Sequence, residues 1–496
     1  MIGWTLQEDK AKIYMSRRFP LQLKRPKNYP SGGCRRVVDT SQTIIEAEDW
    51  LGGGGKDSKG DAERRAEALL KANEGVLRDF KIYADIRRRN NIPTVSFTTS
   101  TRVGALPLRS PVTGHPDFGL IVEPRFSWSS IGEVLNATGF RIVPQLLPYP
   151  DLPQSDRNIP PWVLSSIVLV RVQRLLEKIS RRFVVVLSDL STPKGLIDWG
   201  CYATQKLAFA KHLSVPCSFP DLRDDENLRS AIHFVLREHH SSLTSRRSDG
   251  VVVLKLLALC EELLNRVSGT PPIRPRASQV ERWKQQPLSS QSFTEGLQAI
   301  EWTMEERGLA GLSELSGLSW RMDMEEFFEA WTETIAASIS KKCGAILKSG
   351  RLRQTRVALD WRPSYLGSQR SLIPDVVIHR DDVTMVLDAK YKQHAEEIRF
   401  SGWGNVADEI RERHRADMLQ VLAYTSLFDT PRVIACLVYP CRLETFQSLK
   451  ERGQLIARTV INSGQRQVEL VLVSAPISGE ANALVSSLAE AFQTPL

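Results

Sequence analysis

The sequence lacks the cysteine pairs, histidine clusters and long apolar runs that mark several common protein classes. Its seven cysteines include no Cys-x-x-Cys pair, and an odd number cannot pair completely within one chain. None of its eight histidines stands at a spacing typical of metal ligands. No uncharged apolar run reaches about 18 residues, and the start, MIGWTLQEDKAK, has no apolar signal-peptide core. We therefore expect a cytoplasmic protein with reduced thiols, not a secreted or membrane-spanning one.

A phosphate-binding loop is also missing. The stretch Leu51–Ser58, LGGGGKDS, places four glycines before a lysine, but Asp57 follows where a Walker A loop needs Ser or Thr to bind Mg²⁺. Trp50 stands where the first glycine of that motif belongs. We interpret the stretch as a flexible turn, and we expect this chain to bind no nucleotide itself.

The composition is that of a globular protein with a basic surplus. The chain has 496 residues, of which 42% are hydrophobic and 25% charged, and these values exclude a disordered or fibrous chain. This length is too great for one hydrophobic core and predicts two or three domains. The formal net charge of +9 favours a polyanionic partner such as nucleic acid.

Residues 371–392, SLIPDVVIHRDDVTMVLDAKYK, contain the clearest candidate site. Two apolar runs rich in β-branched residues, Leu372–Ile378 and Val383–Ala389, are joined by the polar connector HRDD, which predicts a β-hairpin. Because side chains alternate between the faces of a strand, Asp388 and Lys390 point the same way. A carboxylate and an ammonium therefore share one face of the hairpin.

The other strand is interrupted by Asp375, whose ionised form is costly there unless a cation compensates it. Pro374-Asp375, twelve further residues and then Asp388-Ala389-Lys390 resemble the PD-(D/E)xK nuclease signature. The two aspartates would bind Mg²⁺, for which Mn²⁺ could substitute, because such ions take hard oxygen ligands, and the carbonyl of Ala389 is a further candidate ligand. Lys390 would orient the attacking water or stabilise the charge of the transition state. The alternative is a hairpin with an ordinary surface salt bridge.

The elements around the hairpin supply context for this signature. Apolar periodicity predicts helices at Asp323–Lys342 and Ala407–Phe428. Strands are expected at Arg356–Arg362 and Arg432–Tyr439. Together with the hairpin they give the order αβββαβ, which is that of the common PD-(D/E)xK core.

Three further side chains on the two helices are candidates for the same site. Gln420 and Tyr424 share a helix face at i and i+4, and this pair resembles the QxxxY motif of RecB-like nucleases, whose residues approach the site or the DNA backbone. By itself the pair is typical of a polar edge beside a core tyrosine. Glu325, Glu329 and Glu333 form an acidic stripe on the first helix, whose ordinary interpretation is a solvated face, and Glu329 is the member that we take as a candidate.

Several stretches taken together are similar to McrC, the nuclease subunit of McrBC modification-dependent restriction systems. The similar residues are Met324–Glu329, Pro374-Asp375, Asp388–Lys392 and Asp417 through Gln420 to Tyr424, and, further upstream, Phe118–Arg125, Lys194-Gly195, Val215–Cys217 and Asp224–Asn227. Arg125 replaces the family's usual lysine and Lys194 its usual arginine. These departures preserve charge but not hydrogen-bond geometry. On this resemblance Glu329 would be an auxiliary metal ligand.

The resemblance implies an α/β (α+β) fold, with a mixed α/β partner-binding domain followed by a restriction-endonuclease-like domain. We expect a basic region of unassigned role at 1–110, a motor-contacting domain at 111–266 and a nuclease domain at 291–496. Residues 267–290, rich in Pro, Ser, Arg and Gln, are expected to form a linker. The implied partners are double-stranded DNA with modified bases and a McrB-like AAA+ hexamer that hydrolyses GTP or ATP in a prokaryotic cytoplasm.

Two other functions stay open. The chain could be a non-cutting adaptor that activates the AAA+ ring, although a scaffold has no use for two carboxylates and a lysine on one face. It could also be a RecB-like exonuclease of DNA repair, which the pair Gln420 and Tyr424 suggests. An exonuclease needs DNA ends, so a covalently closed circle distinguishes it from an endonuclease.

Overall fold

The computed structural model has a mixed α/β fold. It describes residues 34–47, 58–90, 92–147, 149, 160–179, 182–223, 225–285, 290–304, 319–363, 367, 369–392, 396, 407–463 and 466–495. The stretch 51–57 that we interpret as a turn lies outside these residues. No helix among those described combines the length and apolar composition that crossing a bilayer requires. The seven cysteines form no disulfide with one another.

The amino-terminal part contains two sheets and one long helix. The five-stranded sheet has the order β1 (Cys34–Val38), β6 (Phe118–Glu123), β5 (Arg102–Leu108), β11 (Trp320–Asp323) and β7 (Gln145–Leu146). The three-stranded sheet has the order β2 (Gln42–Glu46), β4 (Ile92–Thr98) and β3 (Tyr83–Arg89), and α3 (Ser58–Asp79) packs beside it. The apolar core between them includes Leu69, Phe80 and Phe97, which are fully buried. Strand β11, which lies much later in the sequence, pairs with β5 in the five-stranded sheet. Gly104 of β5 permits the close approach of the two strands, because a Cβ there would lie 2.1 Å from the Trp320 carbonyl oxygen.

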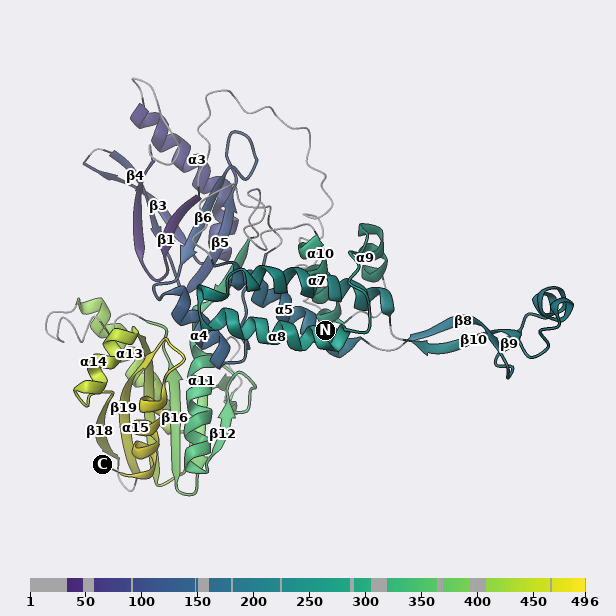
Figure 1. The fold of residues 1–496 in the computed structure, drawn as a ribbon. Coiled ribbons are helices and arrows are strands. Elements are labelled where there is room, and N and C mark those ends of the chain that lie inside the picture. The colour runs from purple at the N-terminus through teal and green to yellow at the C-terminus, as the bar shows by residue number, and fades with distance from the viewer. Residues whose placement is uncertain are drawn as a thin grey trace.

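A helical layer lies between the amino-terminal sheets and the carboxy-terminal sheet (Figure 1). Its helices are α4 (Trp128–Ala137), α5 (Pro161–Lys178), α7 (Glu226–Thr244), α8 (Val251–Val267), α9 (Ala277–Lys284) and α10 (Gln291–Met304). The interval predicted as a linker contains α9, whose Val280 and Trp283 are buried against this layer. The apolar core of the layer continues without a break into the carboxy-terminal sheet. The division of the chain into domains stays a prediction.

A long β-arm leaves the helical layer (Figure 1). It consists of β8 (Arg182–Leu190) paired antiparallel with β10 (Val215–Arg223), and β10 also pairs with β9 (Leu196–Ile197). Its tip holds α6 (Trp199–Cys201), a π-helical turn (Tyr202–Lys206) and a 3₁₀ turn (Leu207–Phe209). Apolar side chains on the arm face solvent: Leu187 is 81% exposed, Trp199 67% and Phe209 71%.

The carboxy-terminal part is a six-stranded sheet covered by helices. Its order is β12 (Ile346–Ser349), β15 (Val376–Arg380), β16 (Val383–Ala389), β17 (Arg432–Cys441), β19 (Arg466–Pro476) and β18 (Ile456–Ser463). The pairs β16–β17 and β17–β19 are parallel, and the other pairs are antiparallel. The helices of this part are α11 (Met324–Cys343), α13 (Asp408–Thr425), α14 (Leu443–Glu451) and α15 (Asn482–Gln493).

The central strand β17 is buried along its whole length because helices cover both faces of the sheet. Its residues Ile434 and Cys436 belong to the same apolar cluster as the buried side chains of α11 and α15. The alternating residues Ala435 and Leu437 pack with Val421 of α13 on the other face. A strand that is buried on both faces has a nearly continuous apolar sequence, as β17 does with RVIACLVYPC.

The predicted order αβββαβ is present in the main sheet and its helices as α11, β12, β15, β16, α13 and β17, but its first strand is not the predicted one. The predicted strand Arg356–Arg362 forms only the two-residue β13 (Val357–Ala358), which pairs with β14 (Ser371–Leu372) outside the main sheet. The first strand is instead β12, a four-residue edge strand whose exposed first residue is the apolar Ile346 and whose buried last residue is Ser349, so it lacks the usual alternation of apolar inside and polar outside.

The first hairpin strand is also shorter than predicted. It was expected at Leu372–Ile378, but β15 begins at Val376, after Pro374. Proline has no N–H to donate to a ladder, so the run is divided at that residue. The second hairpin strand has the predicted bounds, Val383–Ala389.

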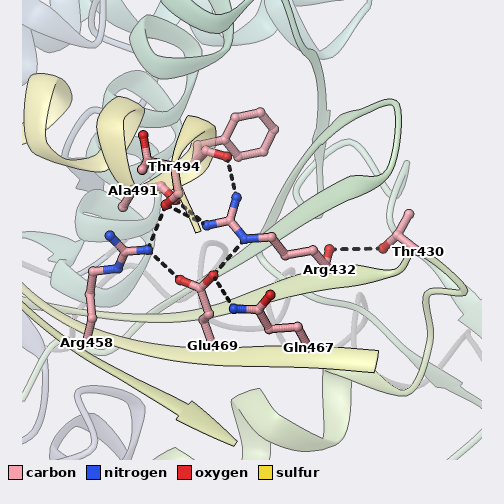
Figure 2. Close-up of polar contacts among 8 residues, drawn as sticks. Thr430, Arg432, Arg458, Gln467, Glu469, Ala491 and Thr494 are labelled. Atoms are coloured by element: carbon pink, nitrogen blue, oxygen red, sulfur yellow. Dashed lines mark hydrogen bonds and ion pairs between the residues drawn. The ribbon is translucent and has the colours of Figure 1, made fainter. Parts of the chain in front are cut away.

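A buried charge network fixes the last helix to the sheet (Figure 2). Arg432 donates from Nε to Oε1 of Glu469 at 2.6 Å, and Arg458 donates from Nη2 to Oε2 of the same carboxylate at 2.6 Å. The other nitrogens of Arg432 donate to the carbonyls of Phe492, Ala491 and Thr494 at 2.7–3.0 Å. A guanidinium at the last carbonyls of α15 satisfies acceptors that the helix cannot satisfy itself.

Candidate active site

The two aspartates of the signature meet at one end of the hairpin. Val376 pairs with Leu387, so Asp375, which directly precedes β15, lies opposite the end of β16 where Asp388 stands. The backbone N–H of Ala389 donates to Oδ2 of Asp375 at 2.8 Å. The hairpin therefore holds both carboxylates at the same edge of the sheet, as the sequence predicts.

Asp388 and Lys390 form a close ion pair on one face. The Lys390 Nζ lies 2.8 Å from Oδ2 of Asp388, and the Asp388 side chain is only 1% exposed. Within the described residues, Oδ1 of Asp388 has no hydrogen-bond partner although it is buried. A buried carboxylate oxygen without a donor is costly, and a cation bound there would remove that cost.

The pKa values in the site show a shortage of positive charge. Burial, followed by the charges of Asp388 and Glu329, raises the pKa of Asp375 to about 8. Burial also raises the pKa of Asp388, although the nearby Lys390 opposes this rise. Burial alone would lower the pKa of Lys390, but its pairing with Asp388 outweighs that effect and raises it. Buried carboxylates with raised pKa values would be stabilised in their ionised form by the binding of a further cation.

Glu329 lies on α11, within electrostatic reach of Asp375. Burial and the charge of Glu326 raise the pKa of Glu329 to about 7, while Arg351 opposes the rise. The neighbouring Phe328 is fully buried and anchors the helix. The helix thus presents a third carboxylate to the site.

Gln420 and Tyr424 lie next to each other on α13, as their spacing predicts. The Gln420 Nε2 donates to the Tyr424 hydroxyl at 3.0 Å. Tyr424 is buried, and its pKa is raised by burial and by the charges of Asp388 and Asp375. The exposed Gln420 therefore contacts a tyrosine that lies within electrostatic reach of both aspartates.

A second polar network beside the site was not predicted as a functional unit. Lys392 donates from Nζ to Oδ1 of Asp417 at 2.5 Å, and the Tyr439 hydroxyl donates to the other oxygen of Asp417 at 3.2 Å. The ring Nδ1 of His414 lies 3.0 Å from that hydroxyl. One signal was available: Lys392 stands two residues after Lys390 in the sequence, directly beyond the end of β16.

Tyr391, which lies between Lys390 and Lys392, also has a hydrogen-bond partner that no local sequence pattern indicates. The Tyr391 hydroxyl donates to Oδ2 of Asp39 at 2.7 Å, and both side chains are buried. Asp39 belongs to the amino-terminal part of the chain, 352 residues away in sequence.

The donor set suits a hard divalent cation. No cluster of three or more His, Cys, Asp or Glu side chains in the described ranges is already arranged to hold a metal. Mg²⁺ does not need such a cage, because it usually keeps several waters and binds through one or two carboxylates. Asp375, Asp388 with its unpartnered Oδ1 and the carbonyl of Ala389 meet that requirement.

A comparison with known protein families decides the affiliation. The family model described as the McrBC 5-methylcytosine restriction system component matches residues 152–440, which is more than half of the 496 residues. The chain belongs to this McrBC family. The matched range includes the whole β-arm and every candidate site residue from Glu329 to Tyr424.

Two solved structures resemble the McrBC-family chain at a distance. One is a refined half-complex from a tetradecameric assembly of Thermococcus gammatolerans McrB AAA+ hexamers with bound McrC, at 14% identity and a TM-score of 0.41, covering 92% of this chain and 99% of that one. The other is a cryo-EM structure of the McrBC complex from the same organism, at 14% identity and a TM-score of 0.26, covering 62% of this chain and 88% of that one. No curated protein matches the sequence.

Proposed function

We propose that this McrBC-family chain is a Mg²⁺-dependent DNA endonuclease subunit of the PD-(D/E)xK class. The observation that supports the proposal best is the convergence of Asp375, Asp388 and Lys390 at one edge of the sheet, where Oδ1 of the buried Asp388 has no partner within the described chain. Retention of an incompletely compensated buried charge is typical of a functional site.

Asp375, Asp388 and the carbonyl of Ala389 would hold the ion, and Glu329 would be an auxiliary ligand. When bound, Mg²⁺ or Mn²⁺ supplies Lewis-acid chemistry to a phosphodiester and makes a bound water more acidic. Lys390 would hold its ammonium beside Asp388 and donate to the negative charge that develops on the phosphate. Gln420 and Tyr424 would donate to backbone phosphates and orient the DNA without reading its sequence.

The proposed macromolecular partner besides DNA is a AAA+ motor. The β-arm presents Leu187, Trp199 and Phe209 to water, and exposed apolar side chains gathered on a projecting element indicate a docking surface. In the Thermococcus gammatolerans assembly McrC is bound to McrB AAA+ hexamers. We infer a partner of the same class for this chain, with the arm as the contact.

Cleavage of closed-circular DNA tests the proposed function. The chain would be incubated with modified or unmodified circles, Mg²⁺ and nucleotide, with and without a McrB-like partner encoded beside it. We expect nicked or linear product that requires the partner and disappears with Asp388→Ala, whereas Asp382→Ala at the exposed hairpin turn cuts as the parent does.

Each other outcome contradicts part of the proposal. Cleavage by Asp388→Ala at the parent rate would mean that the site is wrongly assigned. Intact circles together with erosion of linear DNA would favour the exonuclease. Intact DNA of both forms, with the motor's nucleotide hydrolysis still stimulated, would favour the adaptor.

A further inference from the structure

Residues 390–392, which follow Asp388 and Ala389, are each hydrogen-bonded to a different part of the molecule. The backbone N–H of Lys390 donates to the Val438 carbonyl on β17 at 2.9 Å. The Lys392 ammonium pairs with Asp417 on α13. The hydroxyl of Tyr391, between them, donates to Asp39. Two of these anchors come from the carboxy-terminal sheet and its helix, and the one at Tyr391 comes from the amino-terminal sheet.

The carboxylate of Asp39 is itself held rigidly. Asp39 directly follows β1 and is 1% exposed, and its backbone N–H donates to the Glu123 carbonyl at 2.9 Å. Its Oδ1 accepts the backbone N–H of Arg125 at 2.9 Å, while Oδ2 accepts the Tyr391 hydroxyl at 2.7 Å. Both oxygens are therefore occupied, and the acceptor offered to Tyr391 has a fixed position.

The ring of Tyr391 is confined as well as its hydroxyl. The Arg125 guanidinium carbon lies 4.4 Å from the ring centroid, in cation–π range, and Arg125 Nη1 donates to the Thr40 hydroxyl at 3.1 Å. The ring also packs against Phe126 at 6.0 Å and against Phe328 at 6.3 Å between centroids. Phe328 precedes Glu329 on α11. Tyr391 thus contacts the amino-terminal sheet and the helix that presents the third carboxylate.

We propose that Asp39 and Arg125 are positioning residues, which act through Tyr391 to fix Lys390 relative to Asp375 and Asp388. This inference rests on the proposed nuclease function. The reason is geometric: adjacent residues share a peptide plane, so a pinned Tyr391 ring restricts the backbone that presents the Lys390 ammonium. A charged group that stabilises a transition state loses much of its contribution to the rate when it is displaced by as little as about 1 Å.

The substitution Tyr391→Phe tests the anchor while it keeps the ring. The full chain with its motor partner would cut closed-circular DNA at saturating Mg²⁺ and DNA. We expect kcat to fall by about ten- to a hundredfold with KM nearly unchanged. Tyr149→Phe is a matched control, because the Tyr149 hydroxyl also donates to an aspartate, Asp79, at 2.7 Å on an exposed surface. An equal loss of kcat in both variants, or none in Tyr391→Phe, would overturn the proposal.

Two further measurements separate positioning from general stability and from failure of the proposed function. Amide hydrogen exchange in the metal-free chain should be faster over residues 390–392 in Tyr391→Phe than in Tyr149→Phe, by more than any lower overall stability of Tyr391→Phe produces at the core amides of the same sheet. Mn²⁺ affinity, measured by calorimetry, should stay within about twofold of the parent, because the variant changes no ligand. Unchanged exchange would overturn the positioning role even if the parent chain proves not to cut DNA.

A double-mutant cycle identifies the partner of the hydroxyl. Asp39→Ala should lower kcat to a similar extent, and Asp39→Ala with Tyr391→Phe should be no slower than the slower single variant, since each removes the same hydrogen bond. Multiplicative losses would show that the two residues act independently and would contradict the proposed route through Tyr391.

Discussion

The six-stranded sheet has a cluster of buried charge at each end, and the two clusters differ in how completely the charges are paired. Arg432 is level with Val383, the first residue of β16, whereas Val438 is level with Ala389, the last. At the first end, Glu469 accepts from two guanidinium groups and Arg432 also donates to three helix carbonyls (Figure 2). At the second end, Asp375 and Asp388 lie near Lys390, and Glu329 lies within electrostatic reach of Asp375.

The pKa directions of the carboxylates express this difference. Burial by itself would raise the pKa of Glu469, but hydrogen bonds from Arg432 and Arg458 outweigh it and hold that pKa below its usual value. Burial raises the pKa of Asp375 to about 8, and the neighbouring carboxylates add to the rise. The charge of Glu469 is thus compensated by two guanidinium groups within the fold, whereas the carboxylates around Asp388 are compensated only in part, and it is to this second cluster that we assign the proposed cation.

The largest expected effect is a separation of activity from stability at the incomplete cluster. Asp388→Asn should lower the rate of circle nicking by about a thousandfold or more, because a proposed metal ligand is lost. Its free energy of unfolding should change little, because removal of a buried carboxylate with an unpartnered oxygen offsets the loss of its ion pair with Lys390. Urea titration checks stability, with Asp382→Asn as the exposed control. A marked fall in the denaturation midpoint would place Asp388 among the structural charges.

The complete cluster should respond in the opposite way. Glu469→Gln leaves two buried or half-buried guanidinium groups without their carboxylate, so the free energy of unfolding should fall by about 3 kcal/mol. The nicking rate of the folded fraction should not change, since the network lies at the far end of the sheet. Glu490→Gln, on the exposed face of α15, is the matched control. A slower nicking rate at full folding would show that the two clusters are coupled.

The incomplete cluster could be predicted from sequence, whereas much of its surroundings could not. Strand alternation places Asp388 and Lys390 on one face, and the short connector brings Asp375 opposite, so local patterns suffice for these three residues. The contact between Tyr391 and Asp39 spans 352 residues, and no periodicity links them. The edge strand β12 is not evident in the sequence, because its four residues, ILKS, place an apolar residue on the exposed side and a serine on the buried side.

A third buried titratable group lies outside both clusters, and burial favours its neutral form. His239 of α7 is fully enclosed, with Nδ1 3.2 Å from the Ser165 hydroxyl and Nε2 3.3 Å from the Thr303 hydroxyl. Burial lowers its pKa from 6.5 to about 4. As the pH falls below 6.5 the unfolded chain binds the proton first, so stability is fully present above pH 6.5 and is lost between about 6.5 and 4, by about 3 kcal/mol in total.

Urea titrations across this pH range check the expectation for His239. His239→Gln should flatten the decline between pH 6.5 and 4, whereas His240→Gln, one residue along the same helix and partly exposed, should leave it in place. An unchanged slope in His239→Gln would assign the decline to other groups. Neither histidine belongs to a charge cluster, so the nicking rate of the folded protein should be unaffected in both variants.

The smallest expected effect concerns the network beside the site, which is intermediate between the two clusters. Lys392 is 37% exposed, while its partner Asp417 is 4% exposed and also accepts from Tyr439. Lys392→Met leaves Asp417 with one donor fewer in a buried position, so we expect the free energy of unfolding to fall by about 1 kcal/mol. Arg415→Met, which breaks the exposed pair with Glu412 on the same helix, should change it by less than about 0.5 kcal/mol. Equal changes in the free energy of unfolding in the two variants would mean that Lys392 behaves as an ordinary surface charge and does not belong to the buried charge network that includes Lys390.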